Sequence, residues 1–399
     1  MTPYAAGVFT FYTNLKKALL PFGWRLLTVG LGPWSAERWD NNFAGPDNYL
    51  VAPTVADPTQ QAAALVDWVE NHSVDLLITT SNQEVEHATI PHLPIPVRCL
   101  SRINNIPDAS FAAAVTSLPY LDGIIVNSQR QLDVLALKYE VNRNFIHLIP
   151  HGTDLAFWQE AVTFHQDDSL KIFYIGRLDD SSKGIFFLPS IFAGLKKKGV
   201  PFRAWVVGDG GDRQALETAF RKQGLMDEVT FTGRLMPADI AALLAGQGRK
   251  VFLMPSRFEG FPNSLIEAMA AGCVPVASHL RGVTDMIIEE GKNGFLAPVG
   301  NTRGFAEALA YLYHNTEVHQ QMGEAAGQRI AVHFNLELMG QRYHQLFTET
   351  LEKEPRRREQ LPLTDFSMPG GDHIGWRSKV PTPLKNFIRK WAERFGVHV

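Results

Sequence analysis

The sequence predicts an α/β fold with mostly parallel sheets, divided into two halves. Short apolar runs alternate with stretches of helical periodicity along the whole chain, which is typical of parallel strands joined by helices. The length of 399 residues suits two or three domains, each with its own core. Residues 159–169 are polar and show no periodicity, so we interpret them as a linker between domains.

The first half is expected to form a sheet with an irregular start. Five apolar runs predict strands at residues 25–29, 74–79, 96–101, 123–127 and 145–149, with helices at 60–70 and 129–139. A sheet of this kind usually begins with a strand that leads into a glycine-bearing loop, whereas this chain begins with a loop-like segment that ends at Gly7. Either the first strand is absent or the start codon is late. Both alternatives leave a gap in the middle of the first sheet.

The second half repeats the alternation more regularly. Apolar runs predict strands at residues 171–175, 202–207, 229–232, 250–254 and 274–277. Periodic stretches between and after them predict helices at residues 185–197, 212–223, 237–244, 264–271 and 302–314. The second half therefore has the pattern of an open parallel sheet covered by helices.

Composition excludes several classes of protein. The 38 basic and 41 acidic side chains give a formal charge of -3, which provides no general attraction to nucleic acid. Cys99 and Cys273 are far apart and match no zinc or redox spacing, so a reducing compartment is expected. The chain has no run of 18 apolar residues and no basic start followed by an apolar stretch, so we expect neither a membrane span nor a secretion signal.

The composition changes in the tail, residues 353–399. A basic amphipathic run at 383–395 places apolar side chains on one helical face and lysines and arginines around it. One interpretation is a helix that packs on the body of the protein. The other is a helix that lies on a membrane surface or binds a partner.

The densest cluster of charged and aromatic residues, 255–268, follows a predicted strand and opens a predicted helix. Ligands of open α/β sheets bind at the carboxyl ends of strands, so the cluster lies where a site is expected. The backbone N–H groups of Ser264 and Leu265 would point out of the helix start toward a phosphate. Glu259 and Glu267 would then suit hydroxyl groups on either side of a diphosphate. Alternatively, Ser264 and Glu267 have the spacing of a capping box, which needs no ligand.

Two further clusters follow strands. In residues 176–184 a strand end is followed by Arg177 and, six residues later, by Lys183, and both cations suit a diphosphate. Asp179 and Asp180 could instead neutralise these cations as surface ion pairs. Residues 208–210 (Gly-Asp-Gly) are only part of a dinucleotide-binding fingerprint, and a simple turn between strand and helix also explains them.

The order of the clusters is more specific than any one of them. Gly-Arg-Leu and Lys-Gly within 176–184 are followed by Gly-Asp-Gly, by Phe-Thr-Gly at 231–233 and by a Glu-x7-Glu pattern inside 255–276. This order resembles the retaining GT-B glycosyltransferases of family 4, the glycosyl transferases group 1. The similarity extends through Asn-Gly-Phe-Leu at 293–296 and covers most of residues 145–350.

The resemblance implies two facing Rossmann-like domains with the active site in the cleft and the nucleotide sugar mostly on the second domain. The expected limits are 1–158 for the first domain, 170–333 for the second and 334–352 for a helix that crosses back to the first domain, followed by the tail.

The resemblance also implies roles for single residues. Arg177 and Lys183 would bind the diphosphate, Glu267 the ribose hydroxyls, and Glu259 would orient the transferred sugar. Gly7 would let a first-domain loop approach the phosphates closely. Further contacts with the donor are implied for Gly176, Gly208, Gly233, Gly260, Phe261, Ser264 and Leu265.

The implied reaction is transfer of a hexose with retention of configuration and without a metal. The donor would be a UDP- or GDP-sugar such as UDP-glucose or GDP-mannose, which is a substrate, so no cofactor is expected. The acceptor would be a glycan or a lipid-linked carbohydrate in polysaccharide or glycoconjugate biosynthesis. The expected location is cytoplasmic, with peripheral contact to the inner face of the membrane if residues 383–395 bind it.

One departure from the family pattern concerns a histidine that members commonly carry after a first-domain strand. Here the stretch reads Ser-Arg-Ile-Asn-Asn at 101–105, so Asn104 or Asn105 occupies the place. Asparagine can hydrogen-bond a hydroxyl but cannot take a proton near neutral pH. Either another group such as His87 substitutes, or the reaction does not need one.

Two other functions fit the same fold. One is a nucleotide-sugar-binding homologue with weak or lost catalysis, which the missing histidine and the missing first strand favour. The other is a nucleotide-sugar epimerase, which would need acid and base groups at the sugar. The Glu-x7-Glu pattern favours transfer.

Overall fold

The computed structural model describes residues 6–33, 45–79, 84–104, 108–160 and 168–368. These residues form two compact units, which we describe one at a time. Of the described residues, the first unit contains those as far as His151 together with Leu336–Met368, and the second contains those within Gly152–Asn335. The division at Gly152 precedes the predicted linker at 159–169, of which residues 161–167 lie outside the described residues.

The described part of the second unit has one parallel sheet of six strands in the order β12-β11-β10-β7-β8-β9. The strands are β7 (Leu170–Ile175), β8 (Phe202–Val207), β9 (Val229–Gly233), β10 (Lys250–Met254), β11 (Val274–Ser278) and β12 (Phe295–Ala297). The helices are α7 (Leu155–Gln159), α8 (Asp180–Lys183), α9 (Leu188–Lys197), α10 (Arg213–Lys222), α11 (Pro237–Ala245), α12 (Asn263–Ala270), α13 (Thr302–His314) and α14 (Thr316–His333).

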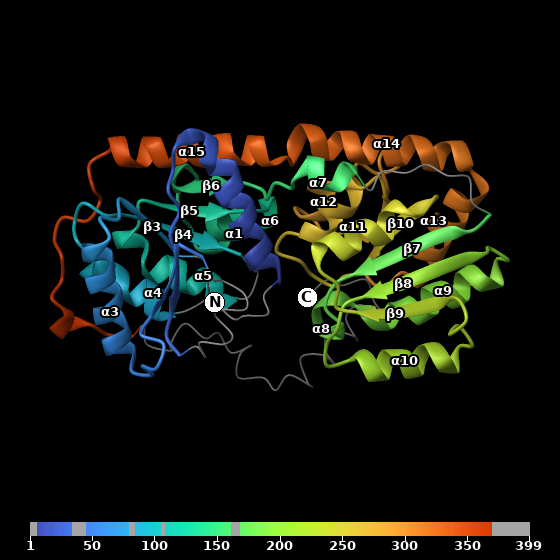
Figure 1. The fold of residues 1–399 in the computed structure, drawn as a ribbon, viewed down its shortest axis with the longest axis horizontal. Coiled ribbons are helices and arrows are strands. Elements are labelled where there is room, and N and C mark those ends of the chain that lie inside the picture. Colours follow the sequence, from blue (N-terminus) through green and yellow to red (C-terminus); the bar gives the residue numbers. More distant parts are fainter. Residues whose placement is uncertain (1–5, 34–44, 80–83, 105–107, 161–167, 369–399) are drawn as a thin grey trace. The chain divides into compact units, whose positions relative to one another are not determined.

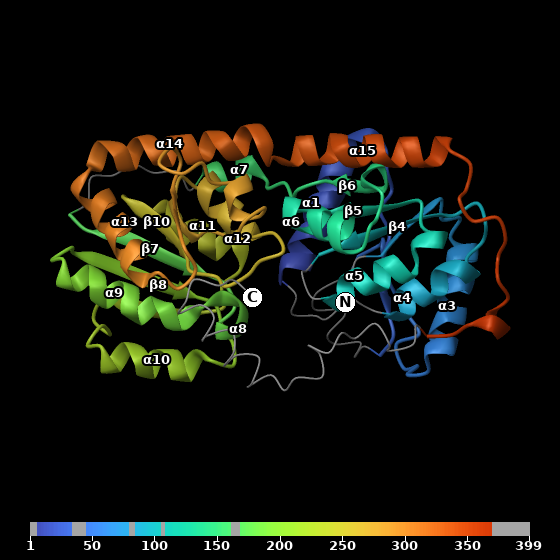
Figure 2. The ribbon, with the colours of Figure 1, turned by 180° about the vertical axis from the view of Figure 1, so that it is seen from behind.

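Helices cover both faces of this sheet (Figures 1 and 2). Successive strand residues point to opposite faces, so Ile172 joins the core beneath α9, α10 and α13, and Phe173 joins the core beneath α11, α12 and α14. Because both faces are buried, the central strands read as continuous apolar runs, and this made them predictable.

The first unit has four parallel strands in the order β3-β4-β5-β6 and a separate parallel pair, β1-β2. The strands are β1 (Thr28–Leu31), β2 (Asn48–Val51), β3 (Leu76–Thr79), β4 (Arg98–Ile103), β5 (Gly123–Val126) and β6 (Ile146–Leu148). The helices are α1 (Ala6–Leu19), α3 (Pro58–Asn71), α4 (Glu84–Thr89), α5 (Asp108–Thr116), α6 (Gln129–Asp133) and α15 (Leu336–Glu352).

Helices α1 and α15 lie side by side on one face of this unit (Figures 1 and 2). Leu15 and Leu19 of α1 and Phe347 of α15 share a core with Leu100 and Ile125 of the sheet. The opposite face carries α3 and α5, whose core residues include Leu65 and Phe111. The first unit is therefore also a helix-covered parallel sheet, and the α/β fold class is confirmed.

Some predicted elements differ from the structure. The strand expected at 25–29 lies at Thr28–Leu31, and the helix expected at 129–139 is α6 followed by a π-helical turn at Val134–Lys138. The short strands β2 and β12 and the long helix α14 were not predicted. Strands of three or four residues give too few alternations for a periodicity signal, which explains why β2 and β12 were not predicted.

The beginning of the tail packs on the first unit. The buried guanidinium of Arg357 donates to the carbonyl oxygens of Ile90 and Leu93 at 3.1 and 2.6 Å. The predicted amphipathic run at 383–395 lies outside the described residues. Both cysteines are buried free thiols, and no described helix is both long and apolar enough to span a membrane.

Candidate active site

The site of the second unit lies at the point where its strand order reverses. From β7 the chain winds outward through β8 and β9, and it then returns to β10 on the other edge of β7. The loops that follow β7 and β10 therefore emerge next to each other at the carboxyl ends of adjacent strands. In open α/β sheets this is where ligands bind.

A buried ion pair joins these two loops. Lys183, the last residue of α8, donates from Nζ to both carboxylate oxygens of Glu259, at 2.7 and 2.9 Å. Ser256 Oγ donates to Glu259 Oε1 at 2.7 Å. The Lys183 side chain is 20% exposed and that of Glu259 only 9%, so the pair has little screening by water. Two residues with implied roles at one nucleotide sugar, Lys183 and Glu259, therefore lie in contact.

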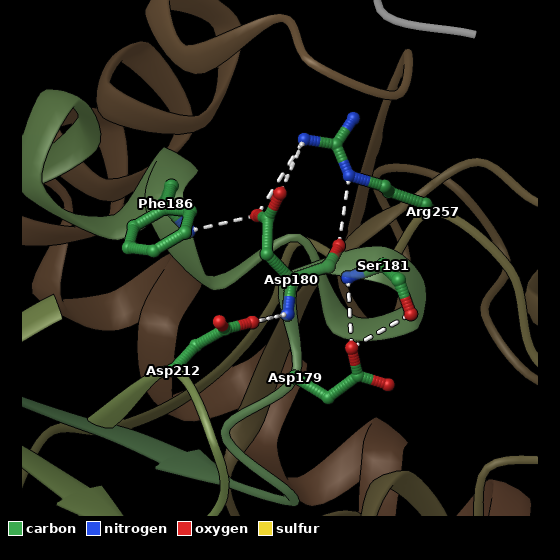
Figure 3. A network of polar contacts seen from close by, with 6 residues as sticks. All are labelled: Asp179, Asp180, Ser181, Phe186, Asp212 and Arg257. Atoms are coloured by element: carbon green, nitrogen blue, oxygen red, sulfur yellow. Dashed lines mark hydrogen bonds and ion pairs between the residues drawn. The ribbon is translucent and has the colours of Figure 1, made fainter. Parts of the chain in front are cut away.

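A second network fixes the loop after β7 (Figure 3). The Arg257 guanidinium donates to Asp180 Oδ2 at 3.2 Å and to the Asp180 carbonyl at 2.9 Å, and both side chains are almost fully buried. The Asp180 backbone N–H donates to Asp212 Oδ2 at 2.8 Å, and the Phe186 N–H donates to Asp180 Oδ1 at 3.1 Å. The side chain and backbone of Asp180 thus connect the loop after β7 to Phe186, Asp212 and Arg257. This role of Arg257 was not predicted from the sequence.

Asp179 caps the short helix α8. Its carboxylate accepts hydrogen bonds from the N–H and the hydroxyl of Ser181 at 2.9 and 2.7 Å (Figure 3). It also accepts from the hydroxyl of Ser182 at 2.9 Å. Burial alone would raise the pKa of Asp179, but these hydrogen bonds outweigh it and lower the pKa below its ordinary value. The alternative that Asp179 and Asp180 form surface ion pairs with Arg177 and Lys183 is not what the structure shows, because Asp179 caps α8 and Asp180 pairs with Arg257. The charge of Arg177 acts on Asp179 only by helping to lower its pKa.

Arg177 is positioned differently from the other charged groups. It is exposed, and its guanidinium forms no ion pair or hydrogen bond with the described residues. Its carbonyl oxygen accepts a hydrogen bond of 2.7 Å from the buried Tyr174 hydroxyl, which anchors the backbone of the loop. An exposed cation on an anchored backbone is suited to an anionic ligand.

Close packing between the loops after β7 and β8 requires glycine at two positions of the second loop. Gly208 has φ +139°, and a Cβ there would lie 1.9 Å from the carbonyl oxygen of Gly176. A Cβ at Gly210 would lie 2.3 Å from the carbonyl oxygen of Leu178. Close packing of the two loops thus accounts for both glycines without a ligand. Gly233, with φ +75°, ends β9, and its carbonyl oxygen accepts from the Gly208 N–H at 2.8 Å.

The capping-box alternative for Glu267 is wrong. Helix α12 begins at Asn263 with Pro262 before it and without a side-chain cap, so Glu267 lies in the second turn. Its half-buried carboxylate forms no hydrogen bond or ion pair with the described residues. Burial raises its pKa from 4.5 to about 7. A half-buried carboxylate without a partner among the described residues suits a ligand that brings hydroxyl donors.

The predicted donors at the start of α12 are only partly available. The Leu265 N–H donates to the carbonyl oxygen of Pro262 at 3.1 Å, and the Leu265 side chain belongs to the core. The expectation that this N–H points at a phosphate is therefore corrected. The Ser264 N–H has no backbone acceptor among the described residues. Gly260 and Phe261 lie in the loop between Glu259 and α12, with Phe261 buried against Phe334.

The remaining candidates lie in the first unit. Gly7 is in the first turn of α1 rather than in the predicted loop. Asn104 follows β4 directly and is half-buried, and Asn105 lies outside the described residues. His87 is buried, and burial lowers its pKa to about 4. Its Nε2 lies 3.3 Å from Oγ1 of Thr79, the last residue of β3.

The described residues include no group of three or more His, Cys, Asp or Glu side chains arranged to hold a metal ion. The residues that the structure brings together are thus Lys183 with Glu259, and Asp180 with Arg257. A cation and a carboxylate with an exposed arginine at a strand switch point are suited to bind a phosphorylated ligand that carries hydroxyl groups.

Comparison with known proteins agrees with the sequence motifs. Residues 159–329 match the family of glycosyl transferases group 1. A glycogen synthase of Mycobacterium tuberculosis is 24% identical over 248 residues, which are 62% of this chain and 59% of that protein. An α-D-kanosaminyltransferase of Streptomyces kanamyceticus is 30% identical over 183 residues, 46% of each chain. The chain thus spans between about half and three fifths of these relatives.

Solved structures share the fold over most of the chain. A glycosyltransferase from Rickettsia africae superposes with a TM-score of 0.73 at 17% identity, over 88% of this chain and 96% of the other. The Anabaena protein HepE, solved in complex with UDP, superposes with a TM-score of 0.71 at 18% identity, over 88% and 98%. The predicted GT-B fold and the resemblance to group 1 glycosyltransferases are confirmed.

Proposed function

We propose that this chain, whose second unit is a group 1 glycosyltransferase domain of the GT-B fold, transfers a hexose from a UDP- or GDP-sugar to a carbohydrate or lipid-linked acceptor. The reaction would serve polysaccharide or glycoconjugate biosynthesis. Transfer proceeds with retention of configuration and requires neither a metal ion nor a cofactor.

The observation that supports this proposal most is the contact between Lys183 and Glu259. Without a donor each of these buried groups neutralises the other. A nucleotide sugar offers both of them better partners, because its diphosphate takes the ammonium group and its sugar hydroxyls take the carboxylate. Arg177, exposed on the same loop as Lys183, adds a second positive charge for the diphosphate.

The same groups would act in the reaction. The bond between the anomeric carbon and the diphosphate breaks, and the negative charge that develops on the diphosphate is stabilised by Lys183 and Arg177. Glu259 holds the sugar while the positive charge develops at its anomeric carbon. The acceptor hydroxyl then forms the new glycosidic bond, so its placement is as important as the removal of its proton.

Donor binding and transfer test this function directly. We expect UDP- or GDP-sugars to raise the melting temperature of the full chain, and one of them to be consumed when a glycan or lipid-linked acceptor is added. Transfer should persist in EDTA. Stabilisation without hydrolysis or transfer in an acceptor screen would identify a binding protein instead, and release of an epimeric nucleotide sugar without acceptor would identify an epimerase.

Glu267 should make the stability of the protein depend on pH. Its pKa is about 7 in the folded chain and 4.5 when exposed, so with rising pH the unfolded state releases the proton first. The free energy of unfolding should therefore decrease between pH 4.5 and 7, in total by about 3 kcal/mol. Glu267→Gln should remove this decrease, as measured by urea unfolding across that range.

The matched control is a glutamine at the exposed Glu354, which should leave the pH profile of the wild-type protein unchanged. Glu267→Gln should also weaken binding of the nucleotide sugar, because an amide accepts fewer hydrogen bonds from two ribose hydroxyls than a carboxylate does. Identical pH profiles and donor affinities for the Gln variant and the wild type would contradict the assignment of this residue.

A further inference from the structure

Ser256 is a fully buried residue of the candidate site that has no role in the reaction described above. It follows β10 at the start of the loop that leads to α12. Its hydroxyl group donates to Oε1 of Glu259 at 2.7 Å. Both partners are buried, so the hydrogen bond forms where a hydroxyl group without an acceptor would be costly. The hydroxyl group is thus directed at the carboxylate that holds the sugar in the proposed reaction.

The two carboxylate oxygens of Glu259 have different surroundings. Oε1 accepts from Ser256 Oγ and from Lys183 Nζ, each at 2.7 Å, whereas among the described residues Oε2 accepts only from Lys183 Nζ, at 2.9 Å. Each carboxylate oxygen accepts about two hydrogen bonds, so Oε1 is saturated and Oε2 is not. When a diphosphate takes the ammonium group of Lys183, Oε1 keeps the serine and Oε2 keeps no partner among these residues. Oε2 is therefore the oxygen that is open to a hydroxyl group of a ligand.

Backbone contacts fix the position of Ser256 independently of the ion pair. The N–H group of Arg257, the next residue, donates to the carbonyl oxygen of Ser182 at 2.8 Å. On the other side of the lysine, a Cβ at Gly184 would lie only 2.4 Å from the carbonyl oxygen of Pro255. The loop after β10 is therefore packed against the end of α8 directly before and directly after Ser256. None of these contacts involves the side chains of the ion pair.

The hydrogen bond from Ser256 limits rotation of the Glu259 carboxylate. The terminal torsion of a glutamate side chain is broad, so a carboxylate that loses its partners rotates easily. In the structure Lys183 and Ser256 hold this carboxylate from two different loops. Once a donor has taken Lys183, the serine is the remaining restraint among the described residues. A carboxylate that is already oriented loses less entropy when the transition state forms.

A second buried serine shows that burial alone does not create such a contact. Ser278 is the last residue of β11, the strand that pairs with β10, and it is also fully buried. Its hydroxyl group nevertheless has no hydrogen-bond partner among the described residues. A serine that only fills space would therefore explain Ser278 but not the hydrogen bond of Ser256. The two serines form a matched pair for an experiment.

We propose that Ser256 is a positioning residue for Glu259. It holds Oε1 after the diphosphate of the donor has taken Lys183, and Oε2 then accepts a hydrogen bond from a hydroxyl group of the transferred sugar. Ser256 does not touch the donor and acts only through the carboxylate. This inference rests on the function proposed above, because it concerns the geometry of the same site.

Replacement of Ser256 by alanine tests this role in the full chain. Ser256→Ala should reduce kcat by about tenfold, as expected for a lost hydrogen bond to a charged group, and should leave the affinity for UDP or GDP, which carry no sugar, unchanged. Ser278→Ala removes a hydroxyl group from an equally buried position and should change neither quantity. A merely structural role of Ser256 would lower the melting temperature without separating kcat from nucleotide affinity.

A double variant tests whether Ser256 acts through Glu259. In a Glu259→Gln background Ser256→Ala should cause no further loss of kcat, because the carboxylate that it positions is already absent. Losses that multiply in the double variant would overturn the proposal. Full kcat of Ser256→Ala in a folded protein would overturn it as well.

Binding separates a failure of this inference from a failure of the proposed function. The preference for UDP-glucose over UDP, or for GDP-mannose over GDP, measures contacts with the sugar without any transfer, and Ser256→Ala should reduce it by about threefold or more. Transfer by the wild type, together with the same preference in Ser256→Ala, would overturn the inference and leave the function intact. A reduced preference without transfer to any acceptor would support the inference and contradict the function.

Discussion

Replacement of Lys183 by alanine should reduce the rate of glycosyl transfer by about 10²–10³-fold, which is the loss expected for one preorganised charged donor at a leaving group. The ammonium group of Lys183 is the only cation in contact with Glu259 among the described residues. It lies at the end of α8, which follows the loop that carries Arg177. Its loss removes positive charge from the departing diphosphate and leaves a buried carboxylate with Ser256 as its partner. Steady-state kinetics with saturating donor would measure the effect.

Two further variants separate catalysis from folding. Glu259→Gln keeps the size of the side chain and should also reduce transfer by orders of magnitude, because a neutral amide binds sugar hydroxyls and a developing positive charge more weakly than a carboxylate does. Lys292→Ala removes an ion pair with Glu289 that is largely exposed, and it should leave the rate unchanged. Full activity of either Lys183→Ala or Glu259→Gln in a folded protein would end the assignment of a transferase.

The meeting of Lys183 and Glu259 could be predicted because it depends on topology. Each residue follows a strand that reads as a continuous apolar run, and adjacent parallel strands end at the same edge of the sheet. The position of β10 beside β7 in turn follows from the winding of the sheet. Residues at strand ends can therefore be brought together from the sequence alone, even when 76 positions separate them.

The pairing of individual charges within the loops could not be predicted. Asp179 and Asp180 are adjacent and chemically identical, yet one caps α8 and the other pairs with Arg257. This choice depends on the backbone turn at 176–180, for which the sequence has no periodic signal. The sequence predicted that α12 begins at Ser264, whereas it begins at Asn263. With this start the Leu265 N–H donates to the Pro262 carbonyl oxygen and is not free for a ligand.

Replacement of Arg257 by methionine should be the most destabilising change in the second unit that we consider, at about 3–5 kcal/mol in the free energy of unfolding. Methionine keeps most of the apolar contact with Phe187, over whose ring the guanidinium lies at 4.3 Å, but leaves the Asp180 carboxylate buried without its cation. The backbone N–H of Arg257 donates to the carbonyl oxygen of Ser182 at 2.8 Å and so ties the loop that carries Glu259 to the segment that carries Lys183, and displacement of this loop would disturb their contact. The free energy of unfolding, measured with urea, and the rate of transfer should therefore both decrease.

The double variant Asp180→Asn with Arg257→Met distinguishes an uncompensated charge from lost packing. Because it removes both charges together, it should recover much of the stability that Arg257→Met loses, whereas the transfer rate should recover less because the loop has still lost its anchor. Arg303→Met, which removes an exposed ion pair with Glu307, is the matched control and should change the free energy of unfolding far less than Arg257→Met does. If Arg257→Met proves no more destabilising than Arg303→Met, the Asp180 network does not hold the two loops of the site together.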